Sequence, residues 1–211
     1  MQDNLETSAH FATAIYSISK PDFLPAVLSV FEENIHKQKQ VKEINALYPV
    51  YMTGNLYMDP RLNDFSTYIA STAWNVLNSQ GYKMDDKITY FHSMWGQEHH
   101  KTSSMEEHVH NDGVQIVGFY FIDCPENSSH MVFTDPRVGK NLLGIVEADP
   151  SKISMASAHI SFKPEVGKLY LTNAWLAHSF SRHASDLPIR FIHFNMEVKP
   201  TIYQNPKVEI V

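Results

Sequence analysis

The second half of the chain reads as a run of short strands, and this pattern limits its possible folds more than any other feature. Segments rich in β-branched and aromatic residues alternate with turn signals built from Gly, Pro, Asn and Asp; they span 87–95, 114–122, 131–134, 158–162, 168–172 and 189–198. No long helical pattern separates them, so parallel βαβ units are not expected. The sequence therefore predicts an antiparallel sandwich or jelly-roll core.

Two amphipathic helices are predicted ahead of these strands. Apolar residues recur at helical spacing through 21–38, and a second helix is expected after them, with Asn63 and Asp64 as its N-terminal caps and Gly81 as its stop. Their apolar stripes should pack on the sheet. The expected fold class is α+β, mainly β, with helices flanking a jelly-roll core.

Composition excludes further classes of protein. Asp and Glu number 23 against 17 Lys and Arg, and the net charge of -6 argues against a general nucleic-acid-binding protein. Cys124 is the only cysteine, so no disulfide can form within the chain. We read no signal peptide and no apolar run long enough to span a membrane. The expectation is one cytoplasmic domain over 1–211, with a helical region at 1–83 and the core at 84–200.

Histidine is in excess, with 12 in 211 residues. The segment EEHVHNDG at 106–113 holds His108, His110 and Asp112 at alternate positions, which lie on one face if the backbone is extended. Two imidazoles and a carboxylate are costly to bury together unless something such as a divalent metal organises them. His178 is the best candidate for a distant further ligand. A His-x-Asp pair with a distant His is the ligand set of non-haem Fe(II) oxygenases.

The last predicted strand suggests an anion site. Arg190 shares a face with Ile192, Phe194 and Met196, and we expect this face to line the barrel interior, where a guanidinium needs an anion. A dicarboxylate held by the metal at one end could reach Arg190 with the other. His193 falls on the opposite face, where an exposed or helix-contacting role is expected.

Other histidines are predicted to have no catalytic role. His92 and the solvated loop pair His99 and His100 belong to this group. The tract 147–159 shows little periodicity, and we expect a binding loop there that sets substrate specificity.

The motifs resemble those of the 2-oxoglutarate- and Fe(II)-dependent oxygenases, in particular a small group common in marine phages, cyanophages and bacteria. The resemblance runs from about residue 93 to 196. It rests on the order of HVHND at 108–112, GFYFIDCPENSS at 118–129, FTDPR at 133–137, PEVGKLYLTNAWLAHSF at 164–180 and IRFIHFNM at 189–196.

This resemblance implies a double-stranded β-helix, the cupin-like jelly roll, and a set of site residues. Fe(II) would be held by His110, Asp112 and His178, and 2-oxoglutarate by Arg190. Relatives with His-x-His at this place suggest an alternative in which His108 replaces Asp112 as a ligand. Ascorbate is a further candidate cofactor.

The implied reaction is hydroxylation of a C–H bond by dioxygen, coupled to decarboxylation of 2-oxoglutarate to succinate. The substrate stays open among a protein side chain such as peptidyl proline, a nucleobase and a metabolite. No membrane partner is expected. If the source is viral, the expected location is the host cytoplasm. The sequence does not predict the oligomeric state, and a dimer is one of the possibilities.

Two other classes compete with this hypothesis. One is a cupin-like metal-binding protein or enzyme that does not use 2-oxoglutarate, and the other is a non-enzymatic protein that kept the fold. An interior Arg190 would favour the oxygenase, because a cupin has no need of a cation facing its metal.

Overall fold

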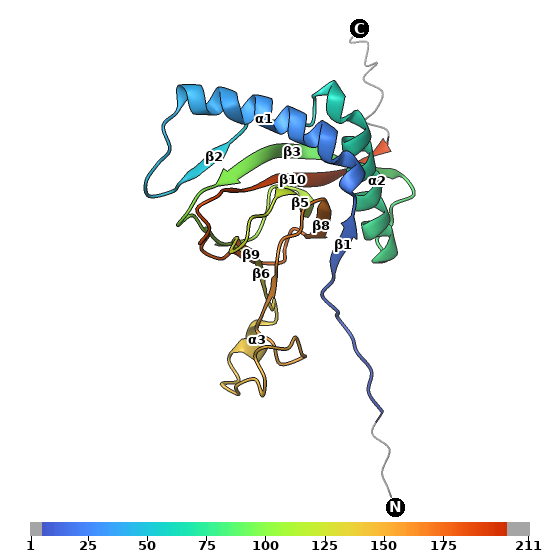
Figure 1. Cartoon of the computed structure of the whole chain (residues 1–211). Coiled ribbons are helices and arrows are strands. Elements are labelled where there is room, and N and C mark those ends of the chain that lie inside the picture. The colour runs from blue at the N-terminus through green and yellow to red at the C-terminus, as the bar shows by residue number, and fades with distance from the viewer. Residues whose placement is uncertain (1–5, 202–211) are drawn as a thin grey trace, which may run out of the picture.

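The computed structural model describes residues 6–201, which form two antiparallel sheets with two helices on one side (Figure 1). The six-stranded sheet has the order β1-β8-β5-β10-β3-β2 and the four-stranded sheet the order β4-β9-β6-β7. In chain order the strands are β1 Ile15–Ser19, β2 Val50–Met52, β3 Lys87–His99, β4 Met105–His108, β5 Val114–Asp123, β6 Met131–Thr134, β7 His159–Phe162, β8 Lys168–Asn173, β9 His178–Phe180 and β10 Ile189–Pro200. The core is a double-stranded β-helix, as predicted.

Both predicted helices are present and cover the outer face of the six-stranded sheet (Figure 1). Helix α1 is Leu24–Val41 and α2 is Asn63–Ser79, each preceded by a 3-10 turn at Pro21–Phe23 or Pro60–Leu62. The predicted cap is wrong in detail, since neither Asn63 nor Asp64 caps α2. The carboxylate of Asp59 accepts from the Arg61 amide at the start of the preceding 3-10 turn.

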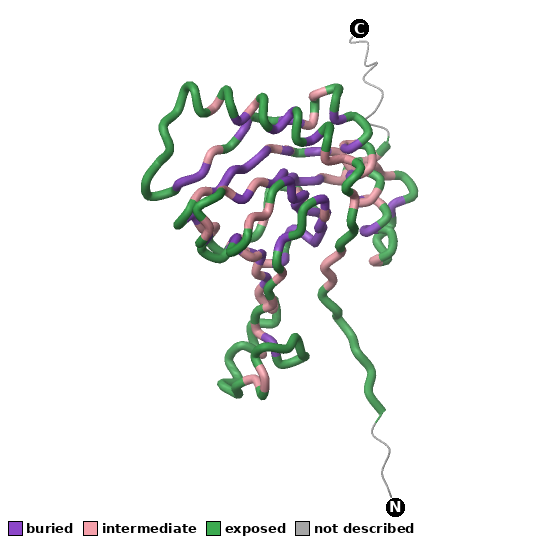
Figure 2. Tube along the Cα trace, viewed as in Figure 1, coloured by how far each residue is buried: buried purple, intermediate pink, exposed green. Residues whose placement is uncertain are grey.

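Alternate residues of the six-stranded sheet enter two separate cores. Ile192, Phe194 and Met196 of β10 belong to a helix-side cluster together with residues of α1 and α2 such as Phe31 and Phe65. Residues of the opposite face and residues from β6, β9 and the turn before β9 form an interior cluster between the two sheets: Phe119, Phe121, Met131, Phe133, Tyr170, Leu176, Phe180, Ile189 and Phe191. Central strands are therefore buried on both faces, as the burial colours show (Figure 2).

Four strands were not predicted from the sequence. The strands β1 and β2 lie in the region expected to be helical and form the two edges of the six-stranded sheet. The strands β4 and β9 are only four and three residues long, too short for a period of two to be recognised. These two short strands pair with each other and position the candidate site.

The chain between β6 and β7 projects from the sheets and includes the short helix α3, Val138–Asn141 (Figure 1). Most of this segment is exposed (Figure 2). Among residues 6–201 no helix has the length and apolar character needed to cross a membrane.

Candidate metal centre

Three imidazoles converge where β4 meets β9. His108 ends β4 and lies directly opposite His178, the first residue of β9. The amide of His110 donates to the carbonyl of Ala174 at 2.9 Å, which holds the segment after β4 against the end of β8. One ring nitrogen from each of His108, His110 and His178 lies within 4.8 Å of the other two. This spacing suits one divalent ion with three imidazole ligands.

Hydrogen bonds to the other ring nitrogens orient two of these rings. His108 Nδ1 is 2.8 Å from the carbonyl oxygen of Glu106, and His178 Nδ1 is 2.9 Å from that of Leu176. Both Nδ1 atoms therefore donate and leave Nε2 as a lone-pair ligand. Nε2 of His110 and of His178 is buried and has no hydrogen-bond partner. Unpartnered buried nitrogens of this kind are what a metal would satisfy.

The local environment keeps two of these rings, those of His110 and His178, neutral. Burial lowers the pKa of His110 to about 4, and the neighbouring His178 and His108 add to this effect. Burial also lowers the pKa of His178 to about 4, opposed by its hydrogen bond to Leu176. Neutral imidazole is the form that binds a metal, so the ligands need not lose a proton near neutral pH.

Asp112 lies outside this cluster. The prediction that residues 108, 110 and 112 share one face is wrong at Asp112, because the extended backbone ends before it. Asp112 has a left-handed φ of 54° and is exposed, and Gly113 continues the turn with a φ of 88°. Of the two ligand sets considered from the sequence, the structure brings together the one with His108.

His193 lies at the site, contrary to the prediction of an exposed or helix-contacting residue. Its ring centroid is 5.3 Å from that of His110, and the ring stacks on Phe119 at 4.4 Å. Nδ1 of His193 donates to the carbonyl of Gly118 at 3.0 Å, and burial lowers its pKa well below the usual value. His99 is also buried, on the same face of the sheet as His193, and is not a solvated loop residue.

Arg190 faces the helices and not the barrel interior, so that prediction is wrong. It does share a face with Ile192, Phe194 and Met196, but those residues belong to the helix-side cluster. Its Nε donates to the Glu98 carboxylate at 2.9 Å, and its Nη1 lies 3.6 Å from Glu32 of α1.

Glu98 explains why a cation stands at position 190. Its side chain is 0% exposed and also binds Lys39 and His100, each at 2.7 Å. Burial alone would raise the pKa of this carboxyl, but these hydrogen bonds and the charge of Arg190 lower it. Arg190 therefore compensates a buried carboxylate.

We expect Arg190→Ala to lower stability by about 1–3 kcal/mol, because the buried Glu98 carboxylate loses one hydrogen-bond partner while Lys39 and His100 remain. Metal affinity should stay as in the wild type. Chemical denaturation and a metal titration of the same preparation measure the two quantities. Unchanged stability with weakened binding of an anionic ligand would contradict this role.

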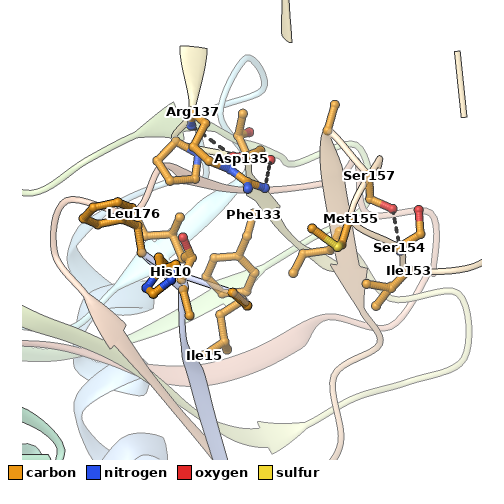
Figure 3. A pocket seen from close by; sticks show the side chains of 18 of the residues that line it. His10, Ile15, Phe133, Asp135, Arg137, Ile153, Ser154, Met155, Ser157 and Leu176 are labelled. Atoms are coloured by element: carbon orange, nitrogen blue, oxygen red, sulfur yellow. Dashed lines mark hydrogen bonds and ion pairs between the residues drawn. The ribbon is translucent and has the colours of Figure 1, made fainter. Parts of the chain in front are cut away.

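A pocket of about 510 Å³ is lined by residues of β6, of the projecting segment and of the N-terminal segment, and by none of the three imidazoles (Figure 3). Phe133 and Leu176 on one side face Ile153 and Met155 of the projecting segment, with His10 of the N-terminal segment close by. The Phe133 ring is 6.3 Å from that of His178. Arg137 donates twice to Asp135 at the rim, at 2.9 and 2.7 Å, and so stabilises the turn that follows β6.

Comparisons with known proteins agree with this architecture. A family model whose description reads "Putative 2OG-Fe(II) oxygenase" matches residues 93–195, which contain the three imidazoles. No curated protein matches the chain significantly.

Solved structures share the fold at low sequence identity. A prolyl-4-hydroxylase from Pseudomonas putida aligns with a TM-score of 0.58 and 6% identity over 88% of this chain and 93% of that one. HygX from Streptomyces hygroscopicus, with nickel, 2-oxoglutarate and hygromycin B bound, aligns with a TM-score of 0.56 and 9% identity over 88% of this chain and 83% of that one. AviO1 from Streptomyces viridochromogenes aligns with a TM-score of 0.61 and 12% identity over 94% of this chain and 93% of that one. The family model thus matches just under half of the chain, and the solved structures share its fold.

Proposed function

We propose that this chain is a metal-dependent oxygenase in which His108, His110 and His178 hold one Fe(II) ion and whose substrate is oxidised at a C–H bond. The observation that carries the proposal is the convergence of three ring nitrogens within 4.8 Å, two of them buried and unpartnered. A bound Fe(II) supplies the dioxygen chemistry that protein side chains lack. The three imidazoles would hold this ion, and Phe119 and Phe133 pack around the His178 ring.

The superfamily implies 2-oxoglutarate as the co-substrate of such a reaction, with hydroxylation as the outcome. The residue expected to anchor its far carboxylate, Arg190, is paired with Glu98 on the opposite face of the sheet. The described residues therefore do not fit this co-substrate in the predicted way.

The pocket shown in Figure 3 is the proposed substrate site. Its floor is formed by Phe133 and Leu176, which flank His178, and Ile153–Ala158 of the projecting segment form another wall. A volume of about 510 Å³ suits a small molecule or one side chain of a larger substrate. Its apolar walls and polar Asp135–Arg137 rim favour a substrate with an apolar body and a polar end.

A titration with Fe(II) under anaerobic conditions, or with Co(II) in air, tests the metal centre. We expect one ion per chain. His108→Ala should weaken binding by more than about 100-fold, because even partners that only orient a ligand are worth 10–100-fold. Asp112→Ala should bind as the wild type does, and the exposed His159→Ala serves as a matched control. Normal binding by His108→Ala beside a defect in Asp112→Ala would refute the three-imidazole set.

A further inference from the structure

Aromatic rings fill the barrel behind the metal centre. Phe180 of β9 and Phe191 of β10 stack with ring centroids 5.0 Å apart and planes 2° from parallel. Phe119 lies 5.3 Å from Phe180, and Phe121 lies 5.6 Å from Phe191. All four side chains are at most 2% exposed. Packing of this kind belongs to a closed core rather than to a ligand channel.

The position of Phe191 makes this packing relevant to the co-substrate. His193 lies beside His110 at the metal centre, and Phe191 is the next residue of β10 on the same interior face. Two residues along a strand span roughly 6.6 Å. A five-carbon dicarboxylate that ran from the metal along β10 would therefore overlap the Phe191 ring and its partner Phe180.

At the far end of this path neither Arg190 nor Lys168 offers a free charge. Ile189, and not Arg190, takes the next interior place on β10. Lys168 shares a face with the interior residue Tyr170, and its Nζ lies 5.4 Å from that ring. That Nζ is also bonded to Glu165 at 2.5 Å, so its charge is already compensated. A buried carboxylate without a cation or hydrogen-bond donors would be strongly disfavoured.

We infer that the barrel of this chain is closed to 2-oxoglutarate, so that its metal centre binds an ion without binding this co-substrate. The inference rests on the proposed three-imidazole metal site. Between the two functions that the sequence leaves open, it favours the one without 2-oxoglutarate, in which any oxidation by dioxygen would take all four electrons from the substrate itself. The physical basis is the face that each residue of β10 presents: Ile189 and Phe191 lie inside, where a dicarboxylate would need a cation and space.

Calorimetry with 2-oxoglutarate on Co(II)-loaded protein tests the inference. We expect one bound Co(II) per chain and no saturable 2-oxoglutarate binding up to about 1 mM. With Fe(II) under anaerobic conditions, addition of 2-oxoglutarate should produce no visible charge-transfer band. Saturable binding that disappears in His110→Ala would overturn the inference and leave the metal site intact. Failure to bind Co(II) at all would overturn the proposed function and this inference with it.

Variants that open the barrel should bind 2-oxoglutarate, which we expect the wild type not to do. Phe191→Ala removes the ring, and the double variant Ile189→Arg with Phe191→Ser adds an interior cation as well. We expect the double variant to bind 2-oxoglutarate at least about 10-fold more tightly than Phe191→Ala, since a charge-assisted pair is the stronger interaction. Circular dichroism and Co(II) stoichiometry check the folding of both variants. If both fold and load Co(II), yet neither binds better than the wild type, these side chains do not close the site.

Discussion

Saturating Ni(II) or Co(II) should raise the melting temperature of the wild-type protein and leave that of His178→Ala nearly unchanged. His178 is 1% exposed, its Nδ1 is held by Leu176, and its Nε2 has no protein partner. Removing this ring deletes a ligand already oriented for the ion. A metal present at 1,000 times its dissociation constant stabilises a fold by about 4 kcal/mol. For a chain of this size that corresponds to a shift of roughly 8–16 °C.

Thermal melts with and without metal measure this difference. His159→Ala, which removes an exposed imidazole of β7, should keep the full shift. A shift of equal size in His178→Ala and the wild type would show that the ion binds elsewhere. Variant melts without metal separate loss of binding from loss of folding.

Gly118→Ala should be the most destabilising small change in the sheet. Gly118 lies in β5 between the cores, and a Cβ there would meet Phe194 Cζ at 2.2 Å and the carbonyl oxygen of Tyr170 at 2.5 Å. The second contact is with backbone, which cannot move aside without disturbing the β5–β8 pairing. Overpacking of this kind costs about 3 kcal/mol.

The expected result is a melting temperature lower by roughly 6–12 °C. Gly54→Ala is a matched control, because a Cβ there would meet nothing within 4 Å. Because His193 donates to the carbonyl of Gly118, a shifted β5 should also weaken metal binding through His110. A wild-type melting temperature in Gly118→Ala would contradict the close packing of Phe194 on this strand.

The order of strands and helices could be predicted because each predicted element has a local sequence pattern, either helical spacing of apolar residues or a run of β-branched and aromatic residues between turn residues. The strand at 131–134 has the predicted bounds, and the others differ by a few residues at their ends. The histidines of the proposed metal site could also be named from residue type, with His110 and His178 in the preferred set and His108 as the alternative to Asp112. The short strands β4 and β9 that join them carry no such local pattern.

The face of a strand could not be predicted where both faces are buried. In β10 the residues from Phe191 to Met196 are all buried. The alternation of side chains along the strand shows that Arg190 and Ile192 share a face. It does not show whether that face is turned to the helices or to the barrel interior. The rule that a buried guanidinium needs an anion was correct. Its anion is Glu98, a residue of this chain, which no spacing argument could link to Arg190.

The sequence by itself determined the fold class, the helices on one side of the sheet and the histidines that could bind a metal, because these depend on periodicity and residue chemistry. The tertiary structure decided which of those residues meet. The turn at Asp112 removes it from the ligand set, and the packing of α1 and α2 makes the Arg190 face of β10 the outer one. Ile189, Phe191 and His193 therefore face the barrel interior, which makes the space behind the proposed metal site apolar and closely packed.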